Sequence, residues 1–410
     1  MGKRHTGLNS SHKSSPNPSN LKPIFGARVQ YIILEDKTHP KLFKQFGEWN
    51  SIGGILFQYL NSPAPFKDIN NSNFAKPLFS NVKNYPLENE VVYITSLPSN
   101  NIESDVNSTE YYYFTTINLW NSVHHNAIPD ALGNKLKPQS QQQDYQQTEA
   151  GSVRRVTDGS TEIPLGSTFK EKLNIKNLLP FEGDVIYEGR WGNSIRFGST
   201  VNNSSVINNW SSTGENGDPI LIIRNGQYDD GKEPWIPITE DINKDLSNLY
   251  VTSTQIIPIE LSSANYNSYE TPPIKPDQYN ENQIILSSGR LIFNSTKDSI
   301  LLSSKKTINL NSQDSVNIDA VNKVVLATKE VLIGGKDASE PIILGNKFLD
   351  DFKNMLVQLS DLCTKLPTVG SVTPYTPNVA VATSATQLQV LVKSMSEKIN
   401  SYKSKVSKTK

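Results

Sequence analysis

A repeat of eight residues between Gln283 and Gly335 constrains the fold of this chain more than any other feature. One column of the repeat contains Ile284, Ile292, Ile300, Ile308, Val316, Val324 and Leu332. The column two residues later contains Leu286, Asn294, Leu302, Leu310, Ile318, Leu326 and Gly334. Side chains two residues apart share one face of a strand, and the Ser, Asn, Asp and Lys residues between the columns are typical of turns. Each octad therefore predicts one short strand followed by one turn.

The length of the repeat favours an assembly of three chains. A β-helix made from one chain needs about 18 residues for each three-sided coil, whereas an octad supplies one side only. A lone chain would leave its apolar columns and its strand edges open to water. We therefore expect three copies wound about one axis, with polar residues such as Lys306, Asp314, Lys323 and Lys329 on the outside. The expected axial core is Ile284, Ile292, Ile300, Leu302, Ile308, Leu310, Val316, Ile318, Val324, Leu326 and Leu332.

An antiparallel meander of short strands is the alternative architecture for this repeat. The seven residues of the first column are all aliphatic and recur every eight residues without a shift. Such regular spacing suits a β-helix better than a meander. The intertwined trimer is therefore the preferred interpretation.

The composition predicts several thin β-modules rather than one large core. A chain of 410 residues is long enough for two to four domains, and only 36% of its residues are hydrophobic. Forty basic residues balance forty acidic ones, so nothing indicates bulk binding of nucleic acid. Cys363 is the only cysteine, which excludes an intrachain disulfide framework and a cysteine-based zinc site. We expect no cofactor and no metal.

Neither a membrane span nor a secretory leader is predicted. The chain contains no run of about 18 apolar residues, and no apolar segment follows Lys3 and Arg4. We expect a soluble protein that is made in a cytoplasm.

The N-terminal third predicts a flexible arm followed by a small barrel. Residues 1–24 are mostly Ser, Asn, Pro, Lys and His, and they are too polar to order by themselves. Residues 25–132 contain five strand-like segments, which suggests an OB-like β-barrel. A barrel that binds single-stranded nucleic acid needs a basic groove. The charges nearest to the aromatic strand Tyr111–Tyr113 are acidic instead, so nucleic-acid binding is not expected.

A second small β-barrel is expected at residues 169–262, between a polar linker at 133–168 and a connector at 263–282. Its Gly-x-x-Gly spacings are followed by neither Gly-Lys-Ser/Thr nor a helix, so they do not predict a phosphate loop. Glu182, Asp184 and Glu188 resemble paired carboxylates for glycoside hydrolysis, although ordinary loops explain them equally well.

The octad prism is expected at residues 283–345, and a helical hairpin with a lysine-rich tail at 346–410. Apolar residues at spacings of three and four predict two helices, with Pro367 ending the first. The expected packing residues are Phe348, Phe352, Met355, Leu359, Leu388, Leu391, Met395 and Ile399. The basic tail is expected either to be solvated or to contact an acidic partner.

The barrel, linker and octads together resemble the baseplate hub and central spike proteins of contractile-tailed, T-even-like bacteriophages and the related VgrG spikes. A segment from Phe181 to Gly198 looks like one that recurs in such hub proteins. Its matching residues are Glu182, Gly183, Asp184, Gly189, Arg190, Trp191, Gly192, Ile195, Arg196, Phe197 and Gly198. Some members of this family carry a lysozyme domain, and no such catalytic constellation is found here.

The resemblance implies a mainly β, homotrimeric virion protein. Because no lysozyme-like constellation is found in this chain, we expect no enzymatic activity. Its N-terminal barrels would contact tail-tube or hub proteins. The prism would help to penetrate the host cell envelope and could carry a spike-tip protein. Two alternatives stay open: a virion-associated hydrolase of cell-wall glycans, and a trimeric receptor-binding tail fibre.

Overall fold

The computed structural model describes residues 24–62, 69, 72–98, 109–117, 166, 169, 175–202, 208–210, 215–231, 236–343, 345–365 and 379–409. The arm predicted at residues 1–24 and the linker predicted at 133–168 lie outside these residues, except for Ile24 and Gly166. The chain divides into two compact units, Met1–Ile259 with Pro276–Ile292 and Glu260–Lys275 with Phe293–Lys410. No described helix is long and apolar enough to span a membrane.

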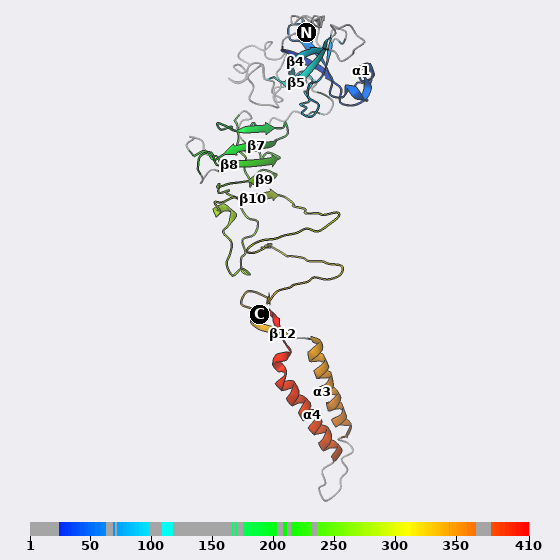
Figure 1. Cartoon of the computed structure of the whole chain (residues 1–410), viewed down its shortest axis with the longest axis vertical. Helices are drawn as coiled ribbons and strands as arrows, with labels where there is room; N and C mark the ends of the chain where they lie inside the picture. Colours follow the sequence, from blue (N-terminus) through cyan, green and yellow to red (C-terminus); the bar gives the residue numbers. More distant parts are fainter. Residues whose placement is uncertain are drawn as a thin grey trace, which may run out of the picture. The chain divides into compact units, whose positions relative to one another are not determined.

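A closed five-stranded barrel forms the first part of the first unit (Figure 1, blue to cyan). Its strands are β1 (Phe25–Ile32), β2 (Ile55–Tyr59), β3 (Asn73–Pro77), β4 (Val91–Pro98) and β5 (Thr109–Thr116). They close in the order β1-β2-β3-β5-β4, in which β3 and β5 are parallel and the other pairs antiparallel. The prediction of a five-stranded barrel in this region is confirmed.

The barrel has a complete core of its own. Alternate residues such as Val29, Ile55 and Phe57 point inward and are buried, as the two-residue period of a strand requires. The hydroxyl of Tyr113 donates a hydrogen bond of 2.6 Å to the carbonyl oxygen of Gly53, which satisfies the one polar atom of that buried ring. Helix α1 (Pro40–Gln45) and the 3₁₀ turn η2 (Glu48–Ser51) follow β1, and α1 adds Leu42 to a side cluster of buried residues.

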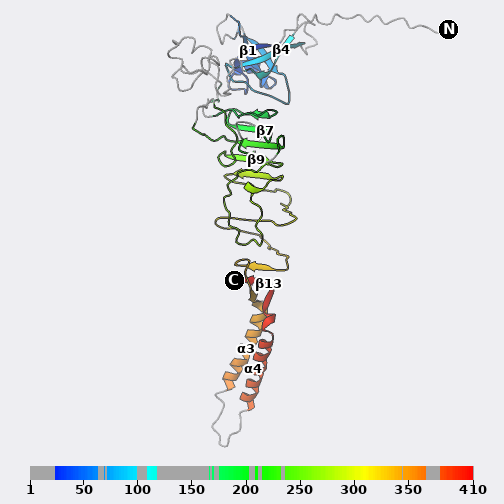
Figure 2. The same ribbon diagram turned by 90° about the vertical axis from the view of Figure 1, so that its left-hand side faces the viewer.

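The second part of the first unit is an open antiparallel sheet, not the barrel that the sequence predicted. Its strands are β6 (Val185–Glu188), β7 (Asn193–Ser199), β8 (Pro219–Asn225), β9 (Ser247–Val251) and β10 (Ile284–Ser288). They lie in the order β10-β9-β8-β7-β6, so β6 and β10 are edges that do not pair with each other (Figure 2, green). Loops close the core instead of strands, since Trp210, Ile242 and Ile257 pack on one face of the sheet.

The first octad belongs to this sheet. Strand β10 contains Ile284 and Leu286, and it pairs with β9 along its whole length. The boundary predicted at residue 283 therefore falls at the edge of a sheet and not between two folded bodies. The segment before β10 contains a 3₁₀ turn, η6 (Pro276–Gln278).

The remaining octads lie in the second unit as extended segments with regularly spaced bends. Residues 293–330 are all described and contain no strand; Figures 1 and 2 draw them as wide open loops. The bends lie at residues 296–298, 305–306, 313–314, 321–322 and 328–329. The turn predicted in every octad is therefore present, whereas the strands have no partner within the single chain.

A three-stranded sheet and two helices complete the second unit. The sheet has the order β11-β13-β12, with β11 (Val331–Ile333) parallel and β12 (Glu340–Ile343) antiparallel to β13 (Lys403–Thr409). The helices are α3 (Gly345–Lys365) and α4 (Val379–Glu397), followed by the 3₁₀ turn η8 (Ile399–Ser401). The predicted helix pair is confirmed. The lysine-rich tail, however, is a strand, because the backbone bonds to β11 and β12 outweigh its weak apolar pattern.

Candidate assembly interface

The octad columns expose their apolar side chains along the whole repeat. Every residue of the expected axial core has an exposed side chain in the single chain, from 37% of the maximum at Leu332 to 76% at Ile292. Burying one Ile, Leu or Val side chain contributes about 1.5–3 kcal/mol. Apolar surface of this extent is unusual on a monomer and marks an interaction site.

The octad backbone also lacks partners. None of residues 293–329 joins a β-ladder with the described part of the chain, although these residues are extended between their bends. Edge groups of this kind are a template for pairing with another chain. The unpaired backbone and the exposed columns thus occur in the same residues.

Side-chain hydrogen bonds close the octad corners at the same interval. The hydroxyl oxygens of Ser304 and Ser312 accept hydrogen bonds from the backbone N–H groups two residues later, each at 3.3 Å. Thr328 repeats this contact at 3.4 Å, whereas Ala320 occupies the equivalent position without a hydroxyl. Such turns are local, so the corners form without a second chain and fix the length of each extended segment.

The outer face of the five-stranded sheet carries two apolar rows that cross all of its strands. The strand pairings align one row as Val185, Phe197, Leu221, Val251 and Ile284. They align the second row as Tyr187, Ile195, Ile223, Leu249 and Leu286. Seven of these ten side chains are exposed and the other three are half-buried.

These rows end on the first octad. Ile284 and Leu286 are at once the first pair of the octad columns and the last members of the two rows. The same spacing of two residues joins Val185 to Tyr187 and Ile195 to Phe197 in the sequence, a signal that could have located the face before the structure was known. The first octad therefore contributes to the exposed apolar face of the sheet.

The inner face of the sheet is fixed by a buried charge network around Arg196. This fully buried side chain donates a hydrogen bond of 2.8 Å to Glu240 Oε1 and one of 3.0 Å to the carbonyl oxygen of Leu179. It also forms an ion pair with Asp184. Its guanidinium also lies 5.3 Å from the ring centre of Trp210. A buried cation with this many partners holds strands and loops in one arrangement. The network therefore fixes the inner side of the same sheet that carries the two apolar rows on its outer face.

Other buried groups extend this network. Arg224 lies 4.0 Å from Asp245, and burial is the main cause that raises the pKa of the Asp245 carboxyl. Lys176 pairs with Asp230 at the end of the module. Arg224, Asp245 and Lys176 are buried, and Asp230 is half-buried.

The residues of the family-like segment spread over both faces and the turns. Ile195 and Phe197 belong to the exposed rows, whereas Arg196 and Asp184 lie in the buried network. Gly192 has a φ of +82°, and a Cβ there would lie 2.9 Å from the Cβ of Gln227, so this turn requires glycine. Gly198 lies in strand β7, opposite Ile220 of β8. The remaining members are in turns or beside them: Glu182, Gly183, Gly189, Arg190 and Trp191.

Arg190 joins this module to the barrel. Its Nη2 atom lies 2.6 Å from Oε1 of Glu90, which directly precedes β4. Trp191 is exposed beside it.

Two of the three carboxylates that resembled a glycosidase pair are held by other groups of the protein, whereas Glu182 lies exposed in a turn. Asp184 pairs with Arg196 and accepts a hydrogen bond of 3.0 Å from the backbone N–H of Phe181. Oε1 of Glu188 accepts a hydrogen bond of 2.6 Å from the backbone N–H of Leu178. No cluster of ligands for a metal ion occurs among the described residues.

Most of the residues predicted to pack between the two helices are only half-buried. Phe348 and Phe352 stack at 5.8 Å between ring centres, and Met355, Leu388, Leu391 and Met395 are half-buried. Phe352 and Leu359 stay exposed, and Ile399 lies in η8 beyond the end of α4. Sequence reasoning missed a polar contact at the far end of the pair, where Lys365 and Ser384 both bond to Asp361 at 2.6 Å.

Comparison with known proteins adds no relative. No family model, no curated protein and no solved structure matches this chain.

Proposed function

We propose that this chain is a structural subunit of a phage tail baseplate, and that three copies form its central hub or spike. The observation that carries the proposal is the agreement of period between the exposed apolar columns and the octad bends. Three chains would turn the columns toward a common axis and would give each extended segment a neighbour on both sides. The assembly would then have no free strand edge except at its ends.

The sheet and the barrel support separate roles in such a hub. The apolar rows of the sheet would add a further apolar contact between the three chains. The barrel closes in the order β1-β2-β3-β5-β4, which supports the OB-like assignment, and it needs no other chain for its core. It would adapt the hub to tail-tube proteins, while the octads form a rod that crosses the host envelope on contraction.

A non-enzymatic role is part of this proposal. Asp184 and Glu188 hold backbone groups and a buried arginine, so neither is available as a general acid. Zymography on bacterial cell walls separates the hub from the hydrolase alternative, because clearing by the pure protein would favour the enzyme. A tail fibre would instead bind host glycans directly and lie at the edge of the baseplate in labelled virions.

Light scattering of the purified protein tests the trimer. We expect a mass near three times the chain mass of 45.6 kDa. Ile308→Asp would place three carboxylates at the axis and should give monomers, since unpaired buried charge is strongly unfavourable. Asn309→Asp adds the same charge to the neighbouring, outward-facing position and should leave the trimer intact. Trimers that persist in the Ile308 variant, or a monomeric wild-type protein, would contradict the proposal.

A further inference from the structure

The helix pair has almost no core of its own. No residue of α3 is buried, and Ser384 is the only buried residue of α4. Helices in proteins derive most of their stability from packing an apolar face. Two helices of 21 and 19 residues with half-buried contacts therefore need a further surface.

One side of α3 supplies an apolar stripe for that surface. The stripe consists of Leu349, Phe352, Leu356, Leu359 and Cys363, at successive spacings of three, four, three and four residues. This spacing keeps side chains on one side of a helix. The four apolar residues have exposed fractions between 38% and 58%, and Cys363 is also exposed. No charged residue interrupts the stripe.

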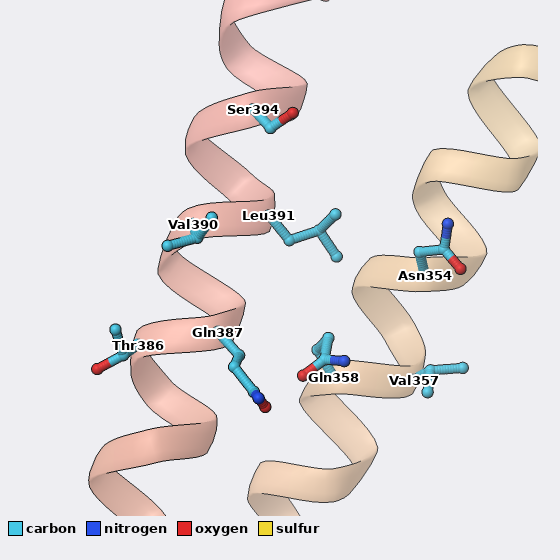
Figure 3. Close-up of a pocket in the computed structure, with 8 residues that line it drawn as sticks. All are labelled: Asn354, Val357, Gln358, Thr386, Gln387, Val390, Leu391 and Ser394. Carbon is cyan, nitrogen blue, oxygen red and sulfur yellow. The ribbon is translucent and has the colours of Figure 1, made fainter.

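The contact between the two helices is largely polar. A cavity of about 560 Å³ lies between α3 and α4. Gln358 and Gln387, which line it, are directed into the space between the helices (Figure 3). The buried Oε1 atom of Gln358 has no hydrogen-bond partner. An unsatisfied buried carbonyl costs about 1–3 kcal/mol. The hairpin as a single copy is therefore incompletely packed on its inner side as well.

The base of the hairpin is fixed to the last octad of the same chain. Strand β13 follows α4 and pairs in parallel with β11, which contains Leu332 of the apolar column. Tyr402 is buried at this junction, 5.9 Å from the ring centre of Phe348, and its hydroxyl bonds to Asp351. This bond is the main cause that raises the pKa of Tyr402 to about 12.

We propose that the α3 stripe packs against the hairpins of two further copies of this chain, so that three hairpins form a six-helix bundle. The inference rests on the proposed function, because it requires the octads to be trimeric. Three last octads meeting at one axis would bring three anchored hairpins, with three identical uncharged stripes, to the same place. The octad columns cannot cover the stripe, since the other two chains already bury them. The bundle is thus a second trimer contact, made by other residues than the octad contact.

Cys363 gives a direct test in the full-length protein, because it is the only cysteine of the chain. Treatment of the trimer with a short bismaleimide should link two chains through this residue at protein concentrations too low for contact between trimers. The matched control is Val357→Cys combined with Cys363→Ser. It places an equally exposed thiol on α3 about 120° around the helix from the stripe, and it should not cross-link.

Leu356→Glu provides the second measurement. It should abolish the Cys363 cross-link, while light scattering still reports a trimer held by the octads. A trimeric protein whose Cys363 does not cross-link, or links no better than the Val357→Cys control, overturns the bundle and leaves the proposed function intact. Protection of Cys363 without a link between chains would show that another surface covers the stripe. A monomeric wild-type protein would overturn the proposed function, and the bundle with it.

Discussion

The barrel and the octads solve the problem of exposed strand edges in opposite ways. Strands β1–β5 pair in a closed ring, and their alternate side chains meet in one buried core within the chain. The octads have the same alternation, but their apolar residues are exposed and their backbone is unpaired. The stability of the barrel should therefore be independent of protein concentration, whereas that of the octads should depend on it. The predictions below test this difference.

The largest effect is expected from a charge on the outer face of the sheet. Phe197 is 52% exposed in the single chain and lies in the middle of an apolar row. Phe197→Asp should abolish the trimer in light scattering, because three carboxylates would enter the interface. The strand signal in circular dichroism should persist, since the residue contributes nothing to the buried side. Retention of the trimer would remove the sheet from the interface.

The barrel should show the reverse behaviour. Phe57 is fully buried in it, so Phe57→Ala should cost about 3–5 kcal/mol of barrel stability. Hydrogen exchange at the amides of β1 and β2 should accelerate to the same extent at every protein concentration. The matched variant is Phe197→Ala, which should leave the barrel amides unchanged and weaken only the trimer. A trimer that fails in Phe57→Ala would show that the two regions are coupled.

A smaller effect is expected at the octad corners. Ser312→Ala removes the hydroxyl that accepts the N–H of Asp314, at an expected cost of about 0.5–1.5 kcal/mol for each chain. The midpoint of thermal dissociation should fall slightly, without a change in the mass of the trimer at low temperature. Ser303→Ala, in an extended segment with no such bond shown, is the control. Equal effects of both variants would argue against a specific role of the corners.

The smallest effect is expected from lowering the pH, which should weaken the polar contact between α3 and α4. Hydrogen bonds from Lys365 and Ser384 hold the pKa of Asp361 below its ordinary value of 3.8. Because this pKa is lower in the folded chain than in the unfolded one, the contact stabilises the pair above pH 3.8. The stabilisation is lost as the pH falls through the lowered pKa.

A spin label on Cys363, in the last turn of α3, measures this loss. Its mobility should rise in that pH range in the wild-type protein. In Asp361→Asn the mobility should no longer change with pH there. An unchanged wild-type signal would mean that Asp361 does not hold the two helices together.

The sequence predicted those parts of the fold whose signal is local and periodic. Alternation identified the five barrel strands, a period of eight identified the octad turns, and spacings of three and four identified α3 and α4. Sheet closure was not predictable, because it depends on whether β6 reaches β10 and not on the pattern of either strand. Strand β13 was missed since Val406 is its only aliphatic residue, and its partners β11 and β12 lie more than 60 residues earlier.

The candidate interface was predictable in part for the same reason. The octad columns were recognisable in the sequence. The structure shows that their side chains are exposed in the single chain. The apolar rows of the sheet were present as residue pairs, but only the strand pairings show that five such pairs align. The buried position of Arg196 depends on Glu240 and Asp184, which are distant in sequence and carry no periodic signal.

The pairing of β13 with β11 has a consequence for how three chains find each other during synthesis. Octads are nearly interchangeable, so three growing chains could wind together one octad out of step and bury almost the same residues. Strand β13 pairs with β11 of the last octad and with β12 beyond it, and the ribosome makes it after the entire repeat. A chain interrupted before that point lacks the element that distinguishes the correct alignment from its neighbours. In the proposed trimer, correct alignment would therefore depend on a strand that is made only after the whole repeat.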